Sequence, residues 1–173
     1  MNNAIITNIL RFIGLVLFQG LILKRLEFQV GWLEYIHPMV YPLFIMLLPL
    51  RTPAPLVVGL GFLTGLGIDL FYQSLGLHAS ATVFLAYIRS YVFGWIEPRG
   101  GYNVNFSPTR RRFGMNWYLR YVLIMLAIHH VFYFSVEAFT FVYIWQIVFN
   151  TLFSFVVSFL FIMMYQLVFD PLD

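Results

Sequence analysis

The sequence contains no cysteine, and only 10% of its 173 residues are charged. Without cysteine, the chain has no disulfides, no thiolate metal sites and no cysteine nucleophile. The shortage of charge excludes an ordinary soluble domain, in which about 25% of residues are charged. Intrinsic disorder is excluded as well, because it requires low hydrophobicity. What remains is a chain that is 61% hydrophobic and 20% aromatic, a composition typical of membrane proteins.

Long hydrophobic runs take up most of the chain. A membrane-crossing helix needs about 20 apolar residues, and six runs approach or exceed this length: 4–23, 35–50, 56–73, 78–96, 118–139 and 142–169. We therefore expect an all-α, multi-pass membrane protein with six transmembrane helices in a single domain, 1–173. The second run is short and contains Pro38, Pro42 and Pro49, so its helix should be kinked or start late.

The basic residues predict the orientation. Six crossings place both termini on one side, and eight of the ten basic residues fall on that side, against Lys24 and Arg25 on the other. The positive-inside rule then predicts that both termini and the polar loop 97–117 are cytoplasmic. This loop carries Arg110, Arg111 and Arg112, which suit anionic lipid headgroups at about 1 kcal/mol per basic residue. A protein partner is the alternative, and nucleic acid is disfavoured.

The third run places two glycines and an acid on one helix face. Gly61 and Gly65 are four positions apart, and Asp69 follows at the same spacing, so the three share a face. Small residues let helix backbones approach closely in lipid, where no hydrophobic force drives helices together. The sequence favours packing of this face within the chain and leaves open that it docks a helix of another protein.

Asp69 in the third run and Arg89 in the fourth are ionisable groups within membrane spans. Inserting such a group costs about 2.5–3.5 kcal/mol, and it usually faces the bundle interior with a partner. Helical side chains lean toward the N-terminus of their helix, so the two lean toward each other and a direct pair is one prediction. The alternatives are pairing with other helices, snorkelling of Arg89 to the cytoplasmic interface, and interfacial hydration of Asp69.

Two histidines, His129 and His130, lie near the middle of the fifth run, and Glu137 follows His130 by seven residues on the same face. A metal site would need further ligands at this depth, and a proton relay would need a chain of Asp, Glu or His groups. His37 and His78 are the other histidines. Buried, hydrogen-bonded packing is therefore the favoured interpretation, with His130 and Glu137 in a polar interior and no metal or other cofactor.

A polar stripe marks one face of the sixth run. Its members, spaced four apart, are Gln146, Asn150, Ser154 and Ser158. Such side chains hydrogen-bond across helices for about 0.6 kcal/mol on average, so we expect this face to be buried in protein. The sequence has no HExxH, GxSxG or P-loop motif, and these are the signatures that a zinc protease, a hydrolase or an NTPase would show. We do not expect an enzyme.

An ordered set of short motifs resembles the rod shape-determining protein MreD family. It comprises Arg51–Pro53, Gly65–Phe71, the hairpin with Gly76 and His78, Pro98–Arg99 with Gly101–Tyr102, and His129–Phe139. Each piece alone is weak, but the ordered set is fairly specific, and in length and order of spans the resemblance covers nearly the whole chain. The resemblance implies a fold similar to the S-component of energy-coupling-factor vitamin transporters.

The resemblance also implies a function. Family members are non-catalytic inner-membrane subunits of the bacterial cell-elongation complex that controls cell shape. Such a subunit binds MreC and connects MreB filaments to peptidoglycan synthesis by RodA and its penicillin-binding partner. The alternative is a vitamin-binding S-component. That class usually docks through an Ala-xxx-Ala pattern on its first helix, which residues 4–23 lack, so the sequence favours the MreD-like function.

Overall fold

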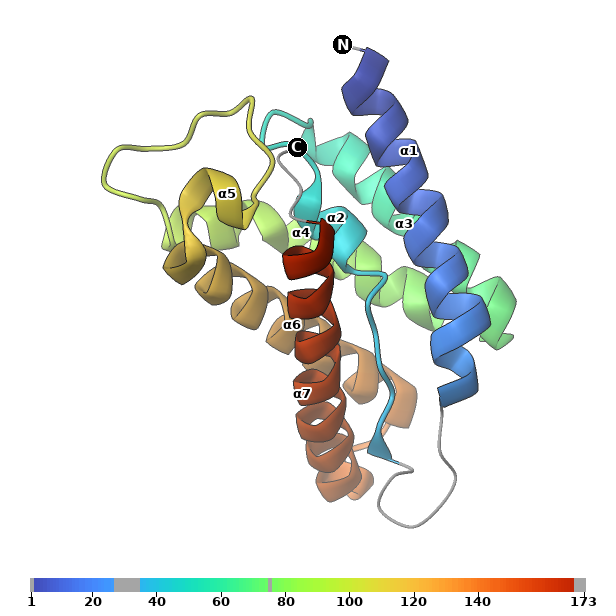
Figure 1. Cartoon of the computed structure of the whole chain (residues 1–173). Coiled ribbons are helices and arrows are strands. Elements are labelled where there is room, and N and C mark those ends of the chain that lie inside the picture. Colours follow the sequence, from blue (N-terminus) through green and yellow to red (C-terminus); the bar gives the residue numbers. More distant parts are fainter. Residues whose placement is uncertain (1, 27–34, 75, 170–173) are drawn as a thin grey trace.

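The computed structural model describes residues 2–26, 35–74 and 76–169 (Figure 1). These residues form an all-α structure without a β-strand. The seven α-helices are α1 (Asn2–Leu17), α2 (Leu43–Leu47), α3 (Ala54–Tyr72), α4 (Leu77–Trp95), α5 (Arg110–Phe113), α6 (Met115–Ala138) and α7 (Ile144–Phe169). A π-helical turn, Phe18–Ile22, and a 3-10 turn, Leu23–Leu26, extend α1. The predicted all-α class is confirmed.

Four helical segments are long and apolar enough to cross a membrane: Ile5–Leu26, Ala54–Tyr72, Met115–Ala138 and Ile144–Phe169. The chain is therefore a multi-pass membrane protein, and these segments match the first, third, fifth and sixth predicted spans closely. Helix α4 coincides with the fourth predicted span and has the length of α3. Its composition is more polar, because it carries Arg89 in its middle and His78 near its start.

The prediction of a transmembrane helix over residues 35–50 is wrong. This segment, which we call the central segment, is helical only at the short α2, and residues 36–40 have no regular structure. Proline explains the difference, because Pro38 and Pro42 lack an N–H group and disfavour a helical conformation in the residues before them. Helix α2 begins directly after Pro42 and ends before Pro49. Residues 38–48 are nevertheless all buried.

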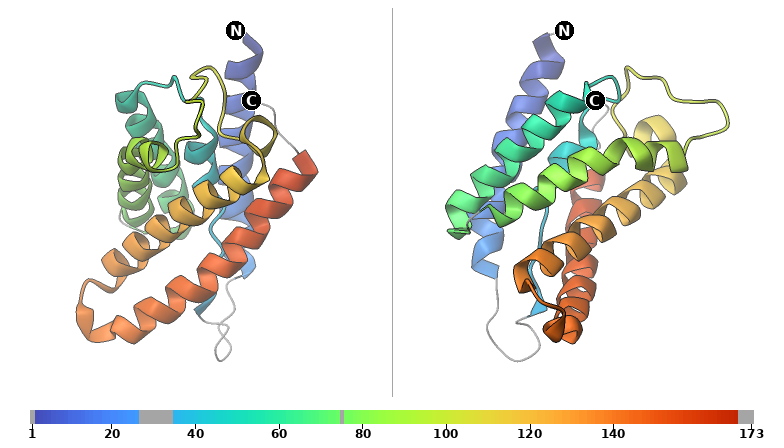
Figure 2. Two further views of the ribbon diagram at one scale, coloured as in Figure 1. Left: turned by 90° about the vertical axis from the view of Figure 1, so that its left-hand side faces the viewer. Right: turned by 180° about the vertical axis from the view of Figure 1, so that it is seen from behind.

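The central segment runs through the bundle from one end to the other (Figure 1). It starts at the end where the helical segment Ile5–Leu26 finishes and leads to the start of α3 at the opposite end. Helix α1 begins and α7 finishes at that opposite end as well, where the polar loop between α4 and α6 also lies (Figures 1 and 2). The chain thus returns along the bundle through residues 35–50, although this segment is not a long helix.

Helices α3 and α4 pack side by side as a hairpin (Figure 2, right). Their contact is so close that a Cβ atom added to Gly65 would lie 2.3 Å from the Ala79 Cα and 2.4 Å from the Thr82 Oγ1. A Cβ on Gly61 would lie 2.9 Å from the Thr82 carbonyl oxygen. The glycine face is therefore covered by α4, and internal packing is the correct interpretation of it. The predicted tight turn Ser74–Leu77 includes Leu75, which lies outside the described residues.

The polar loop is tied to the helices on either side of it. The Tyr102 hydroxyl donates a hydrogen bond to the Phe93 carbonyl oxygen at 2.9 Å, and the Trp117 indole N–H donates to the Ile96 carbonyl oxygen, also at 2.9 Å. Burial raises the pKa of the Tyr102 phenol, since a low-dielectric site disfavours the phenolate. The hydroxyl therefore stays protonated and remains a donor at neutral pH.

We predict that Gly65→Ala destabilises the fold, whereas Gly59→Ala does not. The new methyl group at position 65 would collide with backbone atoms of Ala79, and overpacking of this kind costs about 1–3 kcal/mol. Gly59 lies on the same helix and has open space around it, so its replacement should be neutral or stabilising because alanine favours helix. Thermal unfolding in detergent measures both. The α3–α4 packing would be refuted if Gly65→Ala were as stable as Gly59→Ala.

Candidate functional site

The central segment buries non-helical backbone inside the protein, so its N–H and C=O groups need partners from elsewhere in the chain. Helix α7 supplies two of them. The Ser154 hydroxyl accepts a hydrogen bond from the His37 N–H at 2.9 Å and donates one to the Tyr35 carbonyl oxygen at 3.1 Å. The Ser158 hydroxyl accepts from the Met39 N–H at 2.8 Å. Half of the predicted polar stripe thus binds backbone of the central segment.

The opposite side of the central segment is held by Gln19, in the π-helical turn after α1. Its amide nitrogen donates to the Pro38 carbonyl oxygen at 2.8 Å, and its amide oxygen accepts from the Val40 N–H at 2.8 Å. The same nitrogen lies 3.0 Å from the Tyr72 hydroxyl. Gln19 is only 1% exposed, so its whole hydrogen-bonding capacity serves the protein interior.

The end of the central segment is held by Tyr121 and Arg89. The Tyr121 hydroxyl donates to the Met46 carbonyl oxygen at 2.9 Å, and the Arg89 guanidinium donates to the Leu48 carbonyl oxygen. The guanidinium also lies over the Phe93 ring, 4.7 Å from its centroid. Arg89 is 3% exposed. It therefore points into the bundle and does not snorkel to the interface.

Asp69 joins the end of α3 to the start of α4. One carboxylate oxygen accepts hydrogen bonds from the Ser74 hydroxyl at 2.6 Å and the His78 N–H at 3.0 Å, and the other accepts from the Ala79 N–H at 3.0 Å. The His78 Nδ1 also lies 3.0 Å from Asp69. The first N–H groups of a helix have no intrahelical partners, and a negative charge there is favourable. Asp69 therefore caps α4, and the direct pair with Arg89 that was one of the predictions does not form.

The turn between these helices requires Gly76. Its φ angle is +82°, a left-handed conformation that glycine adopts without the penalty paid by other residues. It directly precedes α4 and so lets the chain reverse while the His78 and Ala79 N–H groups turn toward Asp69. Gly65, Asp69, Gly76 and His78 thus all serve the close packing of α3 on α4.

The two histidines of α6 are buried and hydrogen-bonded. The His130 Nδ1 lies 2.8 Å from the Leu126 carbonyl oxygen, so it carries the proton, and its Nε2 can accept from the Ser158 hydroxyl at 3.1 Å. The His129 Nε2 lies 3.1 Å from the Tyr41 hydroxyl. In the part of the chain that the structure describes, no group of three or more His, Asp or Glu side chains is placed to hold a metal. The contacts are those of packing residues.

Other predicted residues lie outside this network or at its margin. Glu137 is exposed next to the last residue of α6, so its placement in the polar interior was wrong. In the predicted stripe, Asn150 is buried but Gln146 is exposed, which limits the buried face to the part of α7 beside the central segment. Arg110, Arg111 and Arg112 form the start of the short α5. The Arg112 guanidinium lies over the ring of Phe106, 4.1 Å from its centroid.

Three important residues were not singled out from the sequence: Gln19, Tyr41 and Tyr121. A signal for Gln19 was present, since it is a strongly polar residue deep in the first apolar run. The prolines of the second run indicated broken backbone that needs donors and acceptors. Tyrosine gives no such signal in a chain with 11 of them.

The network holds backbone in place, because the side chains of Gln19, Arg89, Tyr121, Ser154 and Ser158 all form hydrogen bonds with main-chain atoms of the central segment. Comparison of the chain with protein-family profiles, curated proteins and solved structures finds no match.

We predict that Gln19→Leu destabilises the protein, whereas Gln146→Leu does not. The first change leaves the Pro38 carbonyl and the Val40 N–H buried without their partner, and each unsatisfied group costs about 1–3 kcal/mol. Gln146 is exposed, and an apolar side chain suits a lipid-facing position there. Unfolding in detergent compares the two. Equal stability of the variants would show that Gln19 does not support the central segment.

We further predict that Asp69→Asn weakens the start of α4. The amide group would place a donor opposite one of the hydrogen-bond donors that Asp69 now satisfies, and the charge that favours the helix N-terminus would be lost. Faster hydrogen exchange at the His78 and Ala79 amides is the expected result. The matched variant Glu137→Gln changes an exposed carboxylate in the same way and should leave these amides unaffected. Unchanged exchange in Asp69→Asn would contradict the capping role.

Proposed function

We propose that the chain is a non-catalytic subunit of the bacterial cell-elongation complex that binds MreC in the cytoplasmic membrane. The proposal starts from the resemblance to the MreD family, and a scaffold-like interior supports it. Through MreC the subunit would help couple MreB filaments to peptidoglycan synthesis by RodA and its penicillin-binding partner. In such a role the interior needs only to be rigid, and recognition takes place on the outer surface.

In this proposal the chain crosses the inner membrane six times, with both termini and the polar loop in the cytoplasm. The central segment makes the second crossing, enclosed by helices, and α4 makes the fourth. The fold would then resemble that of S-components. The excess of arginine toward the end of the bundle that holds the termini supports this orientation through the positive-inside rule.

The observation that carries the proposal is the outward face of α4. Its inward face packs on α3 and α6, while Tyr87, Ser90, Tyr91, Gly94 and Trp95 are exposed. The Tyr87 and Tyr91 hydroxyls lie 3.3 Å apart on this face. Tyrosine and tryptophan are common at a membrane interface, which accounts for the end of the helix.

Interfacial anchoring does not account for Tyr87 and Ser90. Tyr87 lies eight residues before Trp95, about 12 Å deeper along the helix. Hydroxyl and small side chains at this depth are typical of a helix–helix interface in a membrane. The single membrane helix expected of MreC is a partner of matching chemistry. It can pack on the small residues, accept hydrogen bonds from the hydroxyls and donate hydrogen bonds to them.

We predict that Ser90→Leu combined with Gly94→Leu removes most of the MreC that co-purifies with the chain in detergent. Nothing lies within 4 Å of a Cβ added to Gly94, so the bulky side chain blocks an approaching helix without disturbing the fold. Gly59→Leu is the matched control, because Gly59 is also an exposed helical glycine with open space around it. It should retain MreC.

Two results would contradict the proposal. A stable wild-type chain that does not co-purify with MreC would refute binding itself. Full co-purification with the double variant would refute the α4 face as the contact. The thermal unfolding of each variant is measured as well, so that the amount of co-purified MreC is compared between proteins of equal stability.

A further inference from the structure

The outward face of α4 carries two tyrosines whose hydroxyl groups bind each other. Tyr87 and Tyr91 are one helical turn apart and are 59% and 55% exposed, and their hydroxyl oxygens lie 3.3 Å apart. In the described part of the chain, neither hydroxyl has another hydrogen-bond partner. Each phenol brings one O–H group, and the bond between the two uses only one of them. The other O–H group is therefore left without an acceptor among the described residues.

The pair lies near the middle of its helix. Helix α4 runs from Leu77 to Trp95, so Tyr87 is about 15 Å along the axis from the first residue and about 12 Å from the last. In the proposed topology α4 makes the fourth crossing, and both distances place Tyr87 within the hydrocarbon region, which is about 30 Å thick. Acyl chains offer no hydrogen-bond acceptor at this depth. A neighbouring protein helix can supply the missing acceptor, and hydrocarbon cannot.

Contacts on the inward side of α4 fix the position of the pair. Phe84, three residues before Tyr87, stacks on Phe132 of α6 with ring centroids 4.3 Å apart. Arg89, which lies between the two tyrosines in the sequence, points into the bundle and binds the Leu48 carbonyl oxygen. Rotation of α4 about its axis would break both contacts. The hydroxyls are therefore presented at a fixed level, and a partner helix has to bring its acceptor to them.

We propose that the helix bound on the α4 face carries a hydrogen-bonding side chain, Ser, Thr, Asn or Gln, at the level of Tyr87 and Tyr91, and that the tyrosines select the partner by this contact. This inference rests on the proposed binding of MreC. Each of these side chains has an oxygen that accepts the remaining phenol O–H, and such bonds join helices within membranes. A wholly apolar helix would cover that O–H group without satisfying it and is thereby disfavoured. An acidic side chain also accepts, but its insertion into the membrane is costly.

Titration of full-length MreC into the full chain in detergent tests the proposal with the double variant Tyr87→Phe and Tyr91→Phe. Phenylalanine keeps both rings and removes both hydroxyls, so packing is retained. The Kd for MreC should rise about fivefold, which is what one hydrogen bond between membrane helices can supply. Tyr143→Phe is the matched control, because Tyr143 is 56% exposed and lies outside α4; its Kd should equal that of the wild type.

The same titration identifies the acceptor on MreC. Each Ser, Thr, Asn and Gln of its membrane helix is replaced in turn by alanine. One replacement should weaken binding to the wild-type chain about fivefold and cause no further loss with the double variant, because the two changes remove the same bond.

The outcomes separate this inference from the proposed function. If the wild type bound MreC and the double variant bound it equally well, the selecting role of the tyrosines would be overturned and MreC binding would stand. A wild-type chain that does not bind MreC would overturn both. The inference would also fail if the MreC helix had no such side chain, or if every MreC replacement lost affinity independently of the double variant; in that case the hydroxyls would serve a lipid or a second copy of the chain.

Discussion

The structure depends on the need to provide hydrogen-bond partners for a non-helical backbone that is buried inside a membrane protein. Where water is absent, each N–H and C=O group must find a partner within the protein, and a helix normally supplies these partners itself. The prolines of the central segment prevent this. Side chains from four surrounding elements supply the partners instead, namely Gln19 after α1, Arg89 of α4, Tyr121 of α6, and Ser154 and Ser158 of α7. These five side chains are thus distributed around the segment that needs them.

This constraint changes how polar residues within the spans should be interpreted. A charged residue at membrane depth is by default a functional candidate, and Asp69 and Arg89 would each qualify. In the structure Arg89 binds a backbone carbonyl, and Asp69 satisfies the first N–H groups of a neighbouring helix. Both charges are costly to bury, and both offset that cost by completing main-chain hydrogen bonds. Both buried charges are thus accounted for by the fold.

Hydropathy and length were sufficient to predict long helices at five of the six runs, four of them apolar enough to cross a membrane, because a helix that faces lipid must be apolar over its whole length. They failed at residues 35–50, where apolar side chains are equally consistent with a helix and with a buried irregular segment. The prolines indicated a broken helix, but the identity of the side chains that would compensate depends on tertiary contacts. The same limit applied to Gly65, whose spacing indicated a close helix contact and left the partner helix open until the position of α4 was known.

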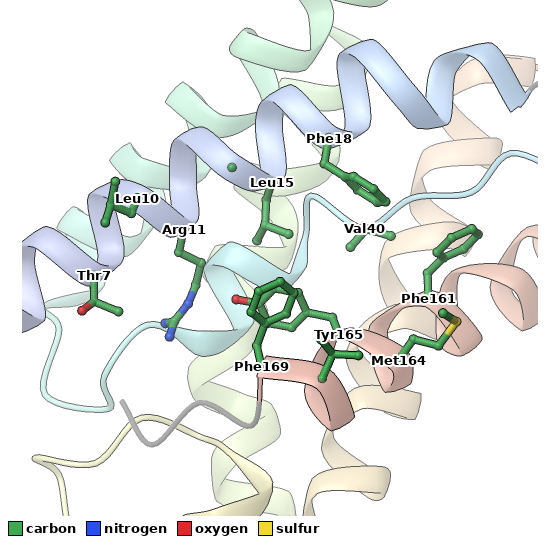
Figure 3. A pocket seen from close by; sticks show the side chains of 12 residues that line it. Thr7, Leu10, Arg11, Leu15, Phe18, Val40, Phe161, Met164, Tyr165 and Phe169 are labelled. Atoms are coloured by element: carbon green, nitrogen blue, oxygen red, sulfur yellow. The ribbon is translucent and has the colours of Figure 1, made fainter.

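The outward face of α4 and the pocket between α1 and α7 (Figure 3) involve different parts of the structure. The α4 face is backed by α3 and α6, which pack closely with it, so a helix bound there meets a rigid surface. The pocket instead joins the first and last spans, which meet at Phe18 and Phe161, and its lining includes Val40. The Val40 N–H is held by Gln19. The pocket lining and the Gln19 hydrogen bonds therefore meet at the same residue of the non-helical central segment.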